Sequence, residues 1–164
     1  MRSRATGMAV AVVFSLLALG TSPATAQPLS LDFGGKLQLL AWEPISDGSN
    51  EISAQPGLPS NWQIALYWQP YGKVEADYTV SLRPLAAGQP LMQGNEPVMQ
   101  DHQPVWGLYP TSRWRQGEIV RDVYALPLPE GVTPEAVQVV VYWITEKGFE
   151  NLGEQVINFS QKQP

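Results

Sequence analysis

The chain contains no cysteine and only one histidine, His102, among its 164 residues. Without cysteine it can form neither disulfides nor thiolate metal sites, and a lone histidine leaves carboxylates as the only further ligands. We therefore expect no metal and no other cofactor. Basic residues are also few, since ten Lys and Arg stand against 15 Asp and Glu, without a basic run. This balance argues against nucleic acid and anionic lipid as partners.

Long apolar runs are also missing, except at the N-terminus. Arg2 and Arg4 precede an apolar run from Met8 to Leu19, and Ala24-Thr25-Ala26 follows with small residues where a signal peptidase cuts. The run is shorter than the roughly 20 residues that a membrane-spanning helix needs. The pattern predicts a signal peptide over residues 1–26. The product is then exported to the periplasm, the cell surface or the medium, without a membrane span.

Cleavage after Ala26 leaves a single domain of ordinary size. It removes two arginines and no acidic residue, so 138 residues remain and the formal net charge changes from −5 to −7. A chain of this length buries roughly two-thirds of its unfolded surface, which is enough to fold without disulfides. We expect an N-terminal linker over residues 27–34 and one β domain over residues 35–161.

Short apolar alternations separated by Pro, Gly, Asn and Asp make up the rest of the chain. This spacing is typical of an all-β fold and predicts an antiparallel β-sandwich, immunoglobulin-like or jelly-roll-like, with about seven to eight strands. No segment sustains helical periodicity. The predicted strands are Lys36–Glu43, Trp62–Gln69, Tyr78–Arg83, Gln116–Leu126, Ala136–Thr145 and Glu154–Ser160, with a weaker one inside Pro90–Gln100.

Two of these strands have the pattern of central strands. In the segment from Trp62 to Trp68 the even positions are large and apolar, so we expect both tryptophans in the core. In the segment from Val137 to Ile144 both faces are apolar, as in a strand that is covered on two sides or flanked by neighbouring strands.

The sequence offers no catalytic constellation, and we expect no enzyme activity. Adjacent residues of an extended chain point apart, so Asp101 and His102 cannot by themselves form part of a triad. No Gly-x-Ser-x-Gly motif occurs. We interpret His102 as a solvated loop residue, Arg121 and Asp122 as residues near a rim, and Asp47–Glu51 as a turn without the ligand spacing of a calcium loop.

Aromatic and basic residues gather between residues 106 and 118, and they are the candidate binding residues. Exposed flat rings can stack on the apolar C–H faces of sugars while neighbouring polar groups bond the hydroxyls. An equally open interpretation is structural: the rings lock a crossover against the core, with Arg113 holding loop carbonyls. The candidates are Trp106, Tyr109, Arg113, Trp114 and Arg115.

The order of several motifs resembles a known domain. The motifs are Tyr67-Trp68-Gln69, Asp77-Tyr78-Thr79-Val80, Gly107-Leu108-Tyr109-Pro110-Thr111-Ser112-Arg113-Trp114, Gly117-Glu118-Ile119-Val120-Arg121-Asp122 and Leu126-Pro127-Leu128-Pro129. Together they resemble the β-sandwich domain at the C-terminus of bacterial membrane glycosyltransferase-like proteins related to the dolichyl-phosphate-mannose mannosyltransferases. The resemblance extends over residues 33–159. One departure is the segment Val141–Ile144, which stands where the relatives often have Gly-Leu-Tyr-Asp.

The resemblance implies an extracytoplasmic accessory module, because the transferase chemistry of those relatives belongs to a multi-pass membrane portion that has no counterpart in this sequence. It supplies no catalytic residues. We therefore expect a non-catalytic module that binds a glycan or another cell-envelope component. The alternative is a structural or protein-interaction domain of the envelope without a glycan ligand. The oligomeric state stays open.

Overall fold

A computed structural model of the chain describes residues 26–45, 62–129 and 131–159. Residues 1–25 of the predicted signal peptide and the predicted turn Asp47–Glu51 lie outside these ranges. No helix of the described residues is long and apolar enough to cross a membrane.

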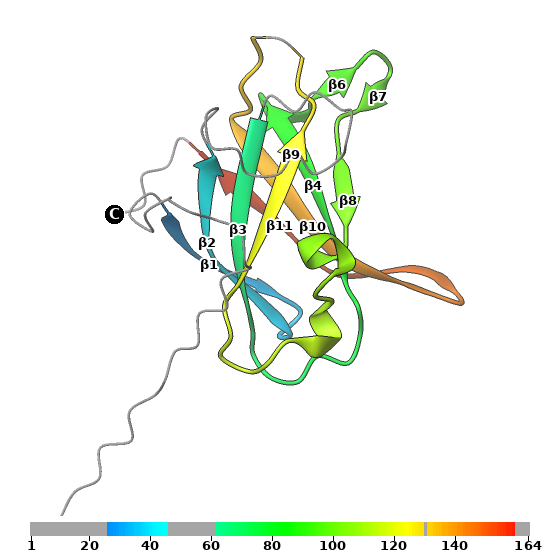
Figure 1. Ribbon diagram of the computed structural model, residues 1–164. Helices are drawn as coiled ribbons and strands as arrows, with labels where there is room; N and C mark the ends of the chain where they lie inside the picture. The colour runs from blue at the N-terminus through cyan, green and yellow to red at the C-terminus, as the bar shows by residue number, and fades with distance from the viewer. Residues whose placement is uncertain (1–25, 46–61, 130, 160–164) are drawn as a thin grey trace, which may run out of the picture.

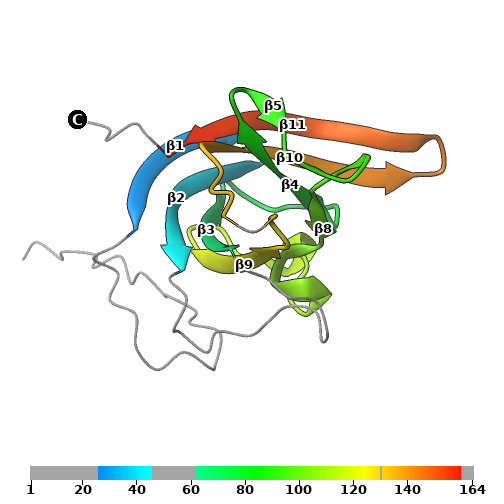
Figure 2. The ribbon, with the colours of Figure 1, turned by 90° about the horizontal axis from the view of Figure 1, so that it is seen from above.

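Two antiparallel sheets pack face to face as a β-sandwich, which confirms the predicted fold class (Figures 1 and 2). The first sheet has the order β1-β2-β3-β9, and the second has the order β11-β10-β4-β5, with β8 also paired to β4. The long strands are β1 (Gln27–Phe33), β2 (Leu37–Ile45), β3 (Trp62–Pro70), β4 (Thr79–Ala86), β9 (Val120–Leu126), β10 (Ala136–Thr145) and β11 (Gly148–Asn158).

Short elements connect β4 to β9. They are β5 (Gln89–Pro90), β6 (Met92–Gln93), β7 (Glu96–Pro97), β8 (Gln100–His102) and the 3-10 turns η2 (Pro104–Gly107) and η3 (Thr111–Arg113). The chain crosses from the first sheet to the second after β3, returns before β9 and crosses again after it. The return crossover, residues 103–119, contains the candidate binding residues and follows directly after β8.

The core lies between the sheets and is built from alternating strand positions. In β3 the side chains of Ile64, Leu66 and Trp68 are fully buried, while Tyr67 and Gln69 on the other face are partly exposed. Trp62 is half-buried against the same core. The predicted core position of both tryptophans is therefore confirmed, with Trp62 at its margin. Phe33 packs edge-on against Trp68, with ring centroids 5.2 Å apart.

The predicted linker over residues 27–34 is wrong, because residues 27–33 form strand β1 at the edge of the first sheet. Leu29, Leu31 and Phe33 face the core in alternation, whereas Pro28 and Asp32 are exposed. Pro28 lacks an N–H donor, which an edge strand tolerates. Strand β1 also approaches β11 of the second sheet, where the Gln155 side chain donates a hydrogen bond to the Asp32 carbonyl at 3.3 Å.

Strand number and bounds differ in detail from the prediction. Seven strands have seven or more residues, in agreement with seven to eight, and four strands of two or three residues bring the number to 11 in the described ranges. The strand predicted from Gln116 begins at Val120, because residues 115–118 make a turn closed by the hydrogen bond from Glu118 N–H to the Arg115 carbonyl. The last strand begins earlier than predicted, at Gly148, because it completes a hairpin with β10.

The turn between β1 and β2 provides a matched test of packing between the sheets. Gly34 and Gly35 both have positive φ, +58° and +63°, so alanine costs conformational energy at either position. A Cβ on Gly34 would lie 2.5 Å from Leu152 Cδ1 and 2.9 Å from the Leu152 carbonyl oxygen, whereas a Cβ on Gly35 meets nothing within 4 Å. Gly34→Ala should therefore lower the free energy of unfolding by about 1–3 kcal/mol more than Gly35→Ala. Urea unfolding of both variants measures the difference, and equal losses would contradict close packing of this turn against β11.

Candidate functional site

Trp114, the most prominent ring of the predicted binding set, belongs to the core. Its side chain is 4% exposed, and its indole Nε1–H donates a hydrogen bond of 3.0 Å to the Tyr109 carbonyl. A buried indole with a bonded N–H stabilises the crossover and offers no face to a ligand. The structure therefore places Trp114 where the structural interpretation expected it.

Tyr109 fastens the same crossover through Glu118. The phenol lies 3.0 and 3.1 Å from the two carboxylate oxygens of Glu118, which is itself buried. The Arg115 N–H donates to the same carboxylate at 2.8 Å. Burial, followed by the hydrogen bond to Glu118, raises the pKa of the Tyr109 phenol, so that it stays a neutral donor. The side chains of Arg113 and Arg115 are exposed, and their backbone groups take part in the turn.

Thr111 joins the crossover to the segment that precedes β4. Its hydroxyl donates to the Ala76 carbonyl at 2.6 Å and accepts the Tyr78 N–H at 2.9 Å. Next to it, the Ser112 N–H donates to Asp77 Oδ1 at 3.2 Å. These bonds fix the second half of the crossover to a part of the chain more than 30 residues earlier.

The first half of the crossover has a strained backbone at Trp106. Val105 (φ 54°, ψ 37°), Trp106 (φ 56°, ψ 34°) and Gly107 (φ 74°) are all in the left-handed region. Such a conformation is an outlier for a β-branched residue and costs on the order of 1–3 kcal/mol per strained residue. Asp122 counteracts the strain, because its Oδ1 accepts the Val105 N–H at 2.8 Å.

The Trp106 ring is the outermost of three stacked rings. Its centroid lies 4.0 Å from that of His102 at an interplanar angle of 26°, and His102 lies 4.2 Å from Tyr124 at 16°. Tyr124 is fully buried, His102 is buried and Trp106 is half-buried. Because His102 covers one indole face, the exposed part of Trp106 belongs to its other face and its edge. Tyr109 is half-buried as well, but it packs against the core and its hydroxyl is bonded to Glu118, so Trp106 is the better candidate for contact with a ligand.

The interpretation of His102 as a solvated loop residue is wrong. His102 is in strand β8, opposite Val80 of β4, so its side chain points between the sheets. Its Nδ1 lies 2.8 Å from the Gln103 carbonyl oxygen, which only accepts hydrogen bonds, so we assign a proton to Nδ1. Nε2 is buried and has no hydrogen-bond partner among the described residues. Stacked between two rings, this imidazole supports Trp106 and is not accessible for proton transfer.

Asp122 lies under this stack, and its expected position near a rim is wrong. It is 1% exposed and faces the core beside Leu66 of β3. Its Oδ2 accepts the Tyr124 hydroxyl at 2.6 Å, while Oδ1 holds Val105. Burial raises the pKa of the Asp122 carboxyl, and the nearby His102 together with these hydrogen bonds counteracts the rise. Sequence reasoning overlooked Asp122 as the residue that joins β9 to the Trp106 turn.

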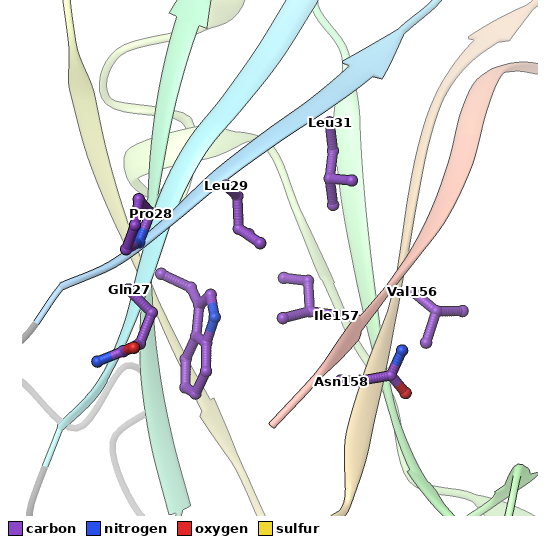
Figure 3. A pocket seen from close by; sticks show the side chains of 8 residues that line it. Gln27, Pro28, Leu29, Leu31, Val156, Ile157 and Asn158 are labelled. Carbon is purple, nitrogen blue, oxygen red and sulfur yellow. The ribbon is translucent and has the colours of Figure 1, made fainter. Parts of the chain in front are cut away.

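A small pocket opens at the opposite side of the sandwich, between β1 and β11 (Figure 3). Its volume is about 80 Å³, and the side chains of Leu29, Leu31, Trp42 and Ile157 form its apolar wall. Ligand pockets for drug-sized molecules have roughly 300–1,000 Å³. This pocket is therefore too small for a sugar ring and its substituents, and the Trp106 crossover remains the better candidate.

Comparison with known proteins adds no relative. No family model, no curated protein and no solved structure matches the chain.

Proposed function

We propose that the chain is an exported, non-catalytic β-sandwich module that binds a glycan, or another component of the cell envelope, through the crossover around Trp106. The observation that carries this proposal is the backbone strain at Trp106, a half-exposed ring supported from below by His102 and Tyr124. Strained backbone concentrates at functional positions, because the surrounding structure must provide the energy that holds it. The proposal explains why the fold presents this ring in a fixed orientation.

A fixed indole face suits a sugar better than a flexible one does. Stacking on the C–H face of a pyranose loses less side-chain entropy when the ring is already held in place. The exposed guanidinium groups of Arg113 and Arg115 belong to the same crossover and can donate to hydroxyls. In this proposal Tyr109 and Trp114 position the crossover, and Trp106 makes the contact.

The buried carboxylates support a non-catalytic module, because each has fixed partners inside the fold. Asp122 is bonded to Tyr124 and Val105, and Glu118 is bonded to Tyr109 and the Arg115 N–H. Glu43 accepts hydrogen bonds from Tyr67 at 2.7 Å and from Arg121 at 3.2 Å on the outer face of the first sheet. Such carboxylates stabilise the fold. Glycoside hydrolysis instead needs two carboxyl groups that flank a substrate cleft.

The sequence supports the setting of the proposed function. The signal-peptide pattern of residues 1–26 supports a location outside the cytoplasm. The resemblance to the C-terminal β-sandwich of membrane glycosyltransferase-like proteins suggests an accessory module of envelope glycan metabolism. A module of this kind would bind the glycan without transferring sugars itself.

Trp106→Ala should weaken glycan binding by at least about tenfold, because a central aromatic contact of an interface is worth about 2 kcal/mol or more. Binding to a glycan array, followed by calorimetry with the best ligand, measures the loss. Tyr71→Ala is the matched control, since it removes an exposed ring from the loop between β3 and β4. Circular dichroism and the thermal unfolding midpoint check the fold of both variants.

Unchanged affinity of a folded Trp106→Ala variant would exclude the crossover as the binding site. A wild-type protein that binds no glycan, but forms a stable complex with one envelope protein, would favour the protein-interaction domain instead.

A further inference from the structure

The outer face of the second sheet presents a second set of polar and aromatic side chains. The strand register places them in neighbouring rows, since Gln138 is opposite Arg83, Val140 is opposite Ser81 and Glu154, and Ser81 is opposite Asp101. The alternate positions of the same strands, among them Val139 and Val141, point into the core. The rows therefore face away from the first sheet.

This face continues onto a projecting hairpin. The pairing of β10 with β4 ends at Tyr142, opposite Thr79, whereas its pairing with β11 continues to Thr145. The end of the hairpin thus extends past the rest of the sheet (Figures 1 and 2). Ile144 and Phe149 are paired there and are 69% and 73% exposed. The Tyr142 ring contacts Phe149 edge-on, with centroids 5.5 Å apart.

Hydrogen bonds hold the polar side chains of this face in order. The Tyr142 hydroxyl reaches across β4 and donates to Asp101 Oδ2 at 3.0 Å. The Arg83 Nε–H donates to Ser81 Oγ at 3.1 Å. Burial, together with the bond to Asp101, raises the pKa of the Tyr142 phenol to about 12, so the phenol stays neutral in ordinary solution. Guanidinium and carboxylate groups have more donors and acceptors than these bonds use, and the remaining ones can form hydrogen bonds with a ligand.

The distribution of charge on this face favours a glycan over a protein. Protein interfaces have an apolar centre depleted of charged residues and a polar rim. Here charged side chains lie within the face: Asp101 and Glu154 flank the buried Ser81 and Val140 in one row, and Arg83 is in the next row with Gln138 and Val156. The exposed Phe149 is at the other end of the face. An apolar partner would desolvate these charges without replacing their hydrogen bonds, which is costly. A sugar chain offers hydroxyls to the charged rows and C–H faces to the ring.

We propose that the outer face of the second sheet, from Arg83 and Gln138 to Phe149, binds an extended, uncharged polysaccharide chain. Phe149 and Tyr142 contact the sugar faces, while Arg83, Asp101 and Glu154 bond the hydroxyls. The seven residues of β10 from Gln138 to Ile144 span about 20 Å along the strand, which accommodates several sugar rings. The ligand class rests on the proposed glycan binding, but the surface is separate from Trp106: Asp101 faces this surface, and the neighbouring His102 faces the stack.

The test is affinity electrophoresis of the purified protein in gels that contain soluble, uncharged α- or β-linked glucans, mannans or galactans, with dissociation constants taken from the retardation. Phe149→Ala and Arg83→Ala should each raise the dissociation constant by about tenfold. Met92→Ala, which removes an exposed side chain from β6, should leave it unchanged. Thermal unfolding verifies that all variants fold. Because Phe149 is exposed, we expect Phe149→Ala to leave the fold intact.

The outcomes separate this inference from the proposed crossover site. Binding that is lost in Phe149→Ala and Arg83→Ala supports the sheet face, whatever Trp106→Ala does. Binding that is lost in Trp106→Ala and unchanged in both sheet-face variants overturns the inference and leaves the crossover site standing. A protein that binds none of these polysaccharides, but loses an envelope protein partner in Phe149→Ala, overturns it in favour of protein docking.

Discussion

Asp122→Ala should lower the free energy of unfolding at pH 7 by about 3–5 kcal/mol, among the largest effects of a single substitution in this domain. The carboxylate is buried and accepts hydrogen bonds from the Tyr124 hydroxyl and the Val105 N–H. Alanine leaves both donors without their acceptor, and each buried unsatisfied donor costs about 1–3 kcal/mol. It also removes the bond that holds the strained turn at Val105 and Trp106. Urea-induced unfolding, followed by tryptophan fluorescence, measures the loss.

Two further variants divide this effect between its hydrogen bonds. Tyr124→Phe removes only the hydroxyl, so it should lower the free energy of unfolding by about a third to a half as much as Asp122→Ala does. Asp122→Asn keeps one acceptor oxygen, so its stability should lie between that of the wild type and that of Asp122→Ala. In a double-mutant cycle of Asp122→Ala with Tyr124→Phe, the double variant should lose less stability than the sum of the two single losses, because both substitutions break the same hydrogen bond. A loss below about 1 kcal/mol in Asp122→Ala would show that the bonds to Val105 and Tyr124 contribute little.

The raised pKa of Asp122 determines whether its contribution to the free energy of unfolding increases or decreases with pH. Burial, its largest cause, raises the folded-state pKa above the ordinary value of 3.8, so the folded state binds the proton more tightly than the unfolded chain does. The stability that this group contributes is complete below the unfolded pKa and is lost as the pH rises through the folded pKa. The stability difference between wild type and Asp122→Asn should therefore be largest at acid pH and decrease as the pH increases. The opposite trend would mean that the His102 and hydrogen-bond contributions outweigh burial.

The sequence was sufficient for the architecture wherever alternation is strong. Strand β3 begins and ends within about one residue of prediction because its alternating apolar residues face the core, and β10 does so because a continuous apolar run between turn-forming residues also predicts a strand. Strand β1 was overlooked although Leu29, Leu31 and Phe33 alternate; Pro28 and Asp32 in the same segment are of residue types that strands disfavour. An edge strand accepts such residues, and its pairing with β2 decides the structure.

The candidate site was less predictable, because its geometry depends on residues distant in sequence. Sequence reasoning found the crossover and its rings, but the exposure of Trp106 and the burial of Trp114 follow from contacts with β8 and β9. One signal was present for Asp122, which shares a strand face with the apolar residues Tyr124 and Leu126. A carboxylate on an apolar face indicates a buried acceptor that needs donors. Its donor at Val105 could not be identified from spacing.

Thr111→Val should destabilise the domain by about 2–4 kcal/mol, although valine and threonine have nearly the same shape. The substitution leaves the buried Tyr78 N–H without its acceptor and the Ala76 carbonyl without its donor. Thr111→Ser is the matched control: it keeps the hydroxyl and loses one methyl group, worth about 0.8 kcal/mol. Hydrogen exchange should show that the Tyr78 amide loses protection in Thr111→Val and keeps it in Thr111→Ser. If valine proves as stable as serine, other contacts, among them those of Trp114 and Glu118, hold the crossover, and Thr111 only fills space beneath it.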